Sequence, residues 1–191
     1  PVLVQDMGRP GLAALGVSVS GALDRGALAA ANAAVGNSPD AAALEITLGG
    51  FSFEAERAMT VALTGAPAPI TLWSAEGHVL IAPHGRPIRL GPGDVISLAA
   101  PAQGMRSYLA AAGGLDVPAV MRSAATDTLA GIGSAPVKAG DRLAIGTQSG
   151  TPATSASPWP RALPTAADIV TLDNVLGPRT DWFTPEAVRL I

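Results

Sequence analysis

The sequence predicts a mainly β fold of short strands, arranged as an all-β barrel or sandwich. Apolar residues alternate with polar ones in several short runs, for example at 44–48 and 51–53. Glycine and proline, with 22 and 17 copies, place turns between these runs at the spacing of an all-β protein. Only one stretch, 24–35, shows the clear apolar stripe of a helix.

The expected strands follow one another along most of the chain. They cover residues 44–48, 51–53, 59–63, 70–73, 78–82, 95–98, 107–111 and 142–145. Pro92 and Gly93 suit the centre of a type II turn, because glycine accepts a positive φ. Asp94 and Asp141 follow a glycine before apolar residues, which favours turn residues over catalysts.

Three helices are expected between and after these strands. In the main one, at 24–35, Asp24 is a plausible N-cap, and Gly36 and Pro39 end the helix. A shorter helix is expected at 40–43. The third begins after Thr184, with proline in its first turn.

The chain divides into two expected domains. Residues 1–146 form the first, and residues 147–167, rich in Thr, Ser, Pro and Ala, form a linker. Residues 168–191 begin a second β domain with a strand at 169–172. This second domain is expected to be incomplete, because the sequence stops inside the third helix.

Composition narrows the classes of function. A chain that is 48% hydrophobic and 14% charged is not disordered, and no apolar run is long enough to span a membrane. The net charge of −3, without a basic cluster, argues against nucleic acid. Without cysteine there is no disulfide, thiolate site or cysteine nucleophile. We therefore expect a cytoplasmic protein without nucleic-acid or membrane partners.

Familiar catalytic and cofactor motifs are missing from the sequence. There is no GxGxxG after a strand and no phosphate-binding loop of the Walker A type. His78 and His84 are the only histidines, and no carboxylate cluster accompanies them. We therefore expect no metal site, and motif chemistry alone supports only a β-rich domain.

Eight blocks, in order, resemble a known family over nearly the whole chain. They are Val4–Gly11, Gly16–Val17 with Ser20–Arg25, Ala31–Asn32 with Val35–Asn37, Ala43–Gly50, Leu63–Ala66, Arg106–Ala110 with Gly113–Pro118, Ser123 with Thr126–Asp127, and Gly177–Asp181 with Phe183–Thr184. The chain resembles the carboxyltransferase A/B group, also called "allophanate hydrolase subunit 2". The group includes part of urea carboxylase, the third subunit of bacterial 5-oxoprolinase and a kinase antagonist of sporulating bacteria.

The resemblance implies a cyclophilin-like β-barrel and a function in a complex. The leading expectation is a subunit of an ATP-dependent 5-oxoprolinase, which opens a lactam to glutamate. Its partners would be a subunit 1-like protein and a lactam-hydrolase subunit, and the complex would bind ATP. The alternatives are a biotin-dependent carboxyltransferase on urea or another small amide, and a non-enzymatic regulator of the subunit 1-like protein.

Two groups of matched residues are candidates for the site. Glu45, inside an apolar strand, is the best general base or substrate ligand, with an outward-facing position as the alternative. Asp24 serves catalysis or caps the helix. Asn32 binds substrate or bonds a neighbouring loop. Gly65 marks a close backbone approach or a donor to a developing oxyanion.

The second group lies on a polar loop and on a later block. Gln5, Asp6 and Arg9 can bind substrate, with Arg9 gripping a carboxylate or phosphate, or an Asp6–Arg9 pair pins the loop. The resemblance adds Ser123, Thr126 and Asp127. It also places an arginine where this chain has Ala124, so that Arg122 would have to take over its role.

Overall fold

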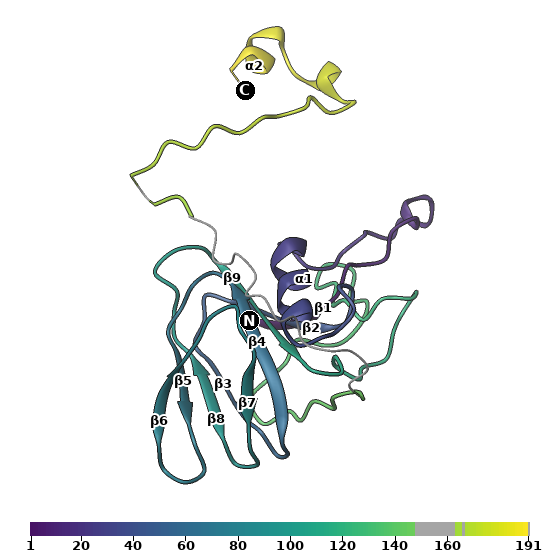
Figure 1. Cartoon of the computed structure of the whole chain (residues 1–191). Coiled ribbons are helices and arrows are strands. Elements are labelled where there is room, and N and C mark those ends of the chain that lie inside the picture. Colours follow the sequence, from purple (N-terminus) through teal and green to yellow (C-terminus); the bar gives the residue numbers. More distant parts are fainter. Residues whose placement is uncertain (148–162, 166, 191) are drawn as a thin grey trace.

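The computed structural model describes residues 1–147, 163–165 and 167–190, and antiparallel strands dominate it (Figure 1). A five-stranded sheet has the order β1-β2-β9-β4-β7. Its strands are β1 (Val2–Gln5), β2 (Ala43–Thr47), β9 (Arg106–Ala111), β4 (Met59–Gly65) and β7 (Ile88–Leu90). A four-stranded sheet has the order β3-β8-β5-β6. Its strands are β3 (Phe51–Glu54), β8 (Val95–Leu98), β5 (Ile70–Trp73) and β6 (Val79–Ala82).

One apolar core joins the two sheets. Ile46, Leu63 and Leu109 of the first sheet share it with Ile70 and Ile96 of the second. Period two explains the pattern, because alternate residues of each strand point to the same face. The mainly β expectation is therefore confirmed. The pairings among the described strands form two sheets and not one closed barrel.

The main helix, α1 (Arg25–Ala34), packs on the other face of the five-stranded sheet, against β4 and β9 (Figure 1). Ala27 and Ala31 of the helix meet Ala62 and Ala110 of the sheet in a second buried cluster. Small side chains on both surfaces let the backbones approach closely. The Asp24 carboxylate accepts a hydrogen bond from the Ala27 N–H at 2.9 Å, so the predicted N-cap is confirmed.

Several predicted elements are wrong. The helix predicted at 40–43 is absent, because residues 40–42 lead into β2 without helical structure and Ala43 already pairs with Gln5 in the sheet. Residues 142–145 form no strand, and Ile145 makes only an isolated bridge to Leu115. The apolar residues there pack on the core from an irregular backbone. Residues 169–172 also form no strand.

Two strands of the structure are not predicted by the sequence pattern. β1 and β7 are only four and three residues long, which is too short for a clear alternating pattern. Their partners, β2 and β4, supply the hydrogen bonds that define them.

The C-terminal part contains two short helical segments, η2 (Thr180–Trp182) and α2 (Pro185–Arg189). The Thr184 hydroxyl accepts from the Ala187 N–H at 3.2 Å, which confirms the predicted helix start. Most of the predicted linker, at 148–162 and 166, lies outside the described residues, and the division into domains stays a prediction. None of the described helices has the length and apolar character needed to cross a membrane.

Two adjacent glycines after β2 offer a matched test of the fold. Gly49 and Gly50 have φ of 64° and 65°, but a Cβ on Gly49 would lie 2.0 Å from the Ala99 carbonyl oxygen, while Gly50 has nothing within 4 Å. We expect Gly50→Ala to cost about 1–2 kcal/mol from left-handed backbone strain. Gly49→Ala should cost more, about 3 kcal/mol or above, because the backbone around Ala99 must also move. Urea unfolding of both variants measures the difference, and equal losses would contradict the packing at Gly49.

Candidate functional site

The carboxylate of Asp6, just after β1, connects the start of the chain to a segment more than a hundred residues later. Its Oδ1 accepts from the Gly8 N–H and from the Ser123 hydroxyl, both at 2.7 Å. Its Oδ2 accepts from the Ala124 N–H at 2.6 Å. These bonds compensate the burial of the charge, since a carboxylate is stabilised by backbone N–H donors. The polar loop of Gln5, Asp6 and Arg9 is thus brought together with the Ser123–Asp127 block, and we call this region the junction.

Arg9 lies in the same junction and is only 2% exposed. Its Nη2 donates to the Ala125 carbonyl and its Nε to the Val120 carbonyl at 3.4 Å. Nη1 has no hydrogen-bond partner, and no acidic side chain forms a salt bridge with Arg9 within the described part of the chain. The alternative of an Asp6–Arg9 pair is therefore wrong, because Asp6 bonds Ser123 and the backbone instead. Among the described residues the guanidinium bonds only neutral carbonyls, although the Asp127 carboxylate interacts with its charge without forming a salt bridge.

Two further buried groups in this junction have unused hydrogen-bonding atoms. Gln5 Nε2 donates to the Thr126 carbonyl at 3.0 Å, but Gln5 Oε1 accepts from no donor. The Thr126 hydroxyl is also without a partner in the described structure. Buried polar atoms are seldom left unsatisfied, and each such exception requires an explanation. A bound ligand or an ordered water that bonded these atoms would be such an explanation.

Asp127 completes the junction. Ser18 donates to its Oδ2 at 2.6 Å, and the Leu129 and Ala130 N–H groups donate to its Oδ1 at 3.0 and 2.9 Å. These donors lower the pKa of the Asp127 carboxyl, with the Ala130 N–H first and the Ser18 hydroxyl next, and Arg9 adds to the effect. Asp127 is therefore a stable anion that organises its own loop.

We call six of these residues the Arg9 cluster, and they are Gln5, Asp6, Arg9, Ser123, Thr126 and Asp127. The cluster offers an unpaired guanidinium N–H, an amide oxygen that accepts and a hydroxyl that does either. These groups suit a small molecule that carries both a carboxylate and an N–H group.

Arg122 does not belong to the cluster. Its side chain is exposed, and its φ of 65° lies in the left-handed region that favours glycine. Its expected substitution for an arginine at position 124 has no support in this geometry. Ala124 contributes only its backbone N–H, to Asp6.

Glu45 lies in a different network, beneath the start of α1. It is 5% exposed, so the alternative of an outward-facing position is wrong. Its Oε2 accepts from the Tyr108 hydroxyl at 2.7 Å and from the Leu23 N–H at 3.0 Å, and Arg106 Nε lies 3.2 Å from its Oε1. The Tyr108 oxygen in turn accepts from the Asp24 N–H at 2.8 Å.

The surroundings of Tyr108 keep it a neutral phenol. Burial raises its pKa most, and the Glu45 carboxylate raises it further, although the Asp24 N–H opposes the shift. Tyr108 can then donate to Glu45 and accept from Asp24 at the same time. The sequence alone did not indicate Tyr108 or Arg106 as partners of Glu45. Only the pairing of β2 with β9 brings these two residues, which share a face of β9, beside it.

The remaining candidates have structural contacts of their own. Asn32 donates to the Ala41 carbonyl at 2.8 Å and accepts from Asn37 at 3.0 Å, as expected for an asparagine that bonds a neighbouring loop. Gly65 has φ of 87°, and a Cβ there would lie 2.4 Å from the Arg106 carbonyl oxygen, so the close backbone approach is present.

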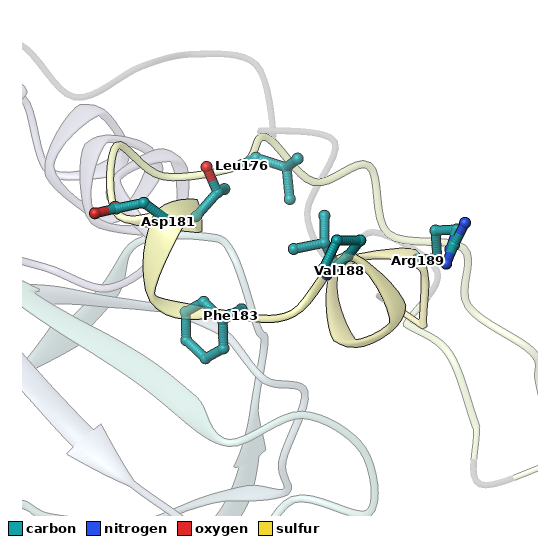
Figure 2. Close-up of a pocket in the computed structure, with 7 residues that line it drawn as sticks. Leu176, Asp181, Phe183, Val188 and Arg189 are labelled. Carbon is teal, nitrogen blue, oxygen red and sulfur yellow. The ribbon is translucent and has the colours of Figure 1, made fainter.

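A hollow on the C-terminal part is lined by Leu176, Asp181, Phe183, Val188 and Arg189, among others (Figure 2). It contains none of the candidate residues. Its charged side chains are paired locally, Asp181 with Arg179 at 2.9 Å and Arg189 with Glu186 at 2.8 Å. The hollow therefore lacks the unsatisfied polar groups that distinguish the Arg9 cluster.

Within the described part of the chain, no three His, Asp or Glu side chains gather as metal ligands. The N-terminus of α1 is capped by the Asp24 carboxylate.

The described chain is thus a mainly β domain with a buried arginine where the first strand meets a later loop. A family model described as "Carboxyltransferase domain, subdomain A and B" matches residues 15–191. The chain belongs to this family.

The chain is similar to two kinds of protein, subunits of 5-oxoprolinases and urea amidolyases. The chain is 45% identical to a subunit of the 5-oxoprolinase of Escherichia coli over 75% of its own length and 46% of that protein. It is 35% identical to urea amidolyase of Saccharomyces cerevisiae over 68% of its length and 7% of that protein. The chain thus spans about half the length of the 5-oxoprolinase subunit.

Solved structures of proteins similar in sequence have a similar fold. A crystal structure of TTHA0988 superposes with a TM-score of 0.74 at 34% identity, and covers 85% of this chain and 59% of that one. The Kluyveromyces lactis urea amidolyase superposes with a TM-score of 0.74 at 30% identity, over 86% of this chain and 10% of that one.

The lowered pKa of Asp127 predicts an acid-dependent loss of stability. A folded pKa below the unfolded value of about 3.9 stabilises the protein above that pH, and the contribution is lost as the pH falls through the folded pKa. Asp127→Asn should therefore flatten the acid side of the stability curve. Ser18→Ala, which removes one donor, should move that acid loss to higher pH. Thermal melts between neutral and acidic pH measure both effects, and unchanged curves would contradict the assignment.

The contacts of Glu45 predict a mainly structural effect of Glu45→Gln. Both carboxylate oxygens are engaged, and the amide weakens the interaction with Arg106. We expect a stability loss of about 1–3 kcal/mol, and less than about a tenfold fall in kcat/KM in an active complex, whereas loss of an acid–base group costs about 10²–10⁴-fold. Steady-state kinetics and melting on one preparation separate the two, and a large rate loss with normal stability would restore Glu45 as a catalytic candidate.

Proposed function

We propose that this chain is part of a 5-oxoprolinase subunit, which acts with partner subunits on a small lactam. The observation that carries the proposal is the 45% identity to the Escherichia coli subunit, compared with 35% to the yeast urea amidolyase. A subunit 1-like protein and a lactam-hydrolase subunit are the proposed partners, and the partner subunits are the proposed site of ATP. We also propose that the two sheets, which pack around one core, correspond to the cyclophilin-like architecture expected from the sequence, without a continuous ring of strand pairings.

In this proposal, the Arg9 cluster binds 5-oxoproline. The Nη1 of Arg9, which has no hydrogen-bond partner among the described residues, pairs with the carboxylate of the substrate. Gln5 Oε1 accepts from the lactam N–H. The Thr126 hydroxyl serves as a third polar contact. Because these side chains are buried, the loop that carries Arg9 has to move for the substrate to enter.

The role of this chain is then to bind and orient the lactam for hydrolysis. Opening the ring adds water across the amide bond and produces glutamate. A bound substrate with its carboxylate fixed on Arg9 and its N–H fixed on Gln5 has one orientation of the amide carbonyl. Such positioning lowers the entropic part of the barrier.

A biotin-dependent carboxyltransferase on urea or another small amide is the second candidate. The description of the family and the similarity to urea amidolyases favour it. Urea has no carboxylate, so this function would leave the Arg9 charge uncompensated by the substrate. A purely regulatory role on the subunit 1-like protein is the third candidate.

Arg9→Lys in the full-length protein, assembled with its partner subunits, tests the proposal. Lysine keeps the charge but loses the planar fork, so we expect KM for 5-oxoproline to rise by about tenfold or more, with a smaller change in kcat. Arg89→Lys, an exposed arginine on β7, is the matched control and should change neither. The measurement is 5-oxoproline-dependent ATP hydrolysis, with melting curves for each variant.

Three outcomes would count against the proposal. An unchanged KM in a normally folded Arg9→Lys protein would show that the carboxylate of the substrate does not bind Arg9. Biotin-dependent carboxylation of urea by the wild-type complex would favour the second candidate. Robust activity of this polypeptide without partners would contradict its role as one part of a complex.

A further inference from the structure

The four sheet edges differ in how they are protected. β1 is covered by an isolated bridge, in which the Val137 N–H donates to the Val2 carbonyl at 2.9 Å. β7 and β3 each carry an exposed charge, Arg89 and Glu54. Charged side chains and added backbone pairing are the usual ways in which proteins prevent edge strands from joining other chains.

β6 has neither kind of protection. It is the outer strand of the four-stranded sheet, and within the described residues no strand pairs with its free edge (Figure 1). It contains no charged residue, and Val79, Leu80 and Ile81 are 60%, 55% and 77% exposed. An uncharged apolar edge of this kind is either an interaction site or a point of aggregation.

Both faces of this edge are apolar. Pairing with β5 places Leu80 opposite Leu72, on the side of the core, and Val79 opposite Trp73, on the outer side. Trp73 is itself 41% exposed, so Val79, Ile81 and Trp73 extend one apolar surface on the outer face. A strand added at the free edge would therefore find backbone groups to bond and apolar side chains to cover on both faces.

We propose that β6 pairs with β6 of a second copy of the same chain, antiparallel about a two-fold axis near Ile81. The charges that flank the strand support this occupant. Glu76, in the turn before β6, precedes Ile81 by as many residues as Arg86 follows it. Antiparallel pairing of two copies therefore brings Glu76 of each toward Arg86 of the other, while parallel pairing would bring like charges together.

Both charged residues are available for such contacts. The Glu76 side chain is 85% exposed, and its described partner is His78 at 3.7 Å, which pairs only when protonated. Arg86 is exposed and forms no salt bridge within the described part of the chain. A symmetric, self-complementary interface of this kind is typical of homodimers. The two four-stranded sheets would become continuous across the axis.

The oligomeric state of the full-length protein, measured by sedimentation velocity over a range of concentrations, tests the proposal. The wild type should form a dimer. Ile81→Lys should raise the dimer Kd by about tenfold or more, because two lysines would face each other at the axis. Leu129→Lys is the matched control, since Leu129 is 97% exposed and lies outside the strands. Ile81→Thr keeps the β-branched shape and should weaken the dimer less.

A charge exchange tests the orientation. Glu76→Arg and Arg86→Glu should each weaken the dimer, and the double variant should recover the wild-type Kd, because the opposite charges are again paired between copies. Circular dichroism verifies that each variant is folded. A monomeric wild type, a Kd insensitive to Ile81→Lys, or a double variant weaker than both single variants would overturn the proposal. Association of β6 only with a different protein would also overturn it.

Discussion

Asp6 and Arg9, which carry opposite charges, are both buried on one short loop. The junction between this loop and residues 120–127 depends on their burial. Asp6 and Arg9 are separated by two residues, yet each bonds the segment at 120–127 and not the other. A buried charge without hydrogen bonds is too costly to persist, so the loop and the segment can only be buried together. This requirement joins the first strand to residues more than a hundred positions away, and it gathers the polar groups of the Arg9 cluster.

The asymmetry between the two charges separates structure from function. Asp6 has donors for both oxygens, and its bonds account for its burial. Among the described residues Arg9 bonds only carbonyls, and its Nη1 has no hydrogen-bond partner, while Asp127 interacts with its charge without a salt bridge. The unused Nη1 N–H is therefore the group that is left to bind an anion.

The network around Glu45 performs a comparable task at the start of α1. The Glu45 carboxylate and the Tyr108 hydroxyl bind the backbone N–H groups of Leu23 and Asp24, and thereby fix the residues that begin α1. The helix can then lie close to the sheet because alanines line both surfaces. Glu45 therefore positions the start of α1, and its role as a general base stays a prediction. The family relationship is compatible with either function of the whole protein.

The sequence by itself determined the local features of this protein. Short apolar or alternating runs between turn residues predicted most strands, and the Asp24 and Thr184 caps follow from side chains that bond the backbone nearby. The eight sequence blocks between Val4 and Thr184 also indicated the family. Only the tertiary structure decided the partners of Glu45 and Arg9, which are supplied by Tyr108 and by the 120–127 segment. It also decided that 142–145 is not a strand and that β6 is a free edge. These partners come from residues far apart in the sequence. The residues of a short segment determine its local conformation, but not which distant segment packs against it, and this is why the sequence pattern did not predict them.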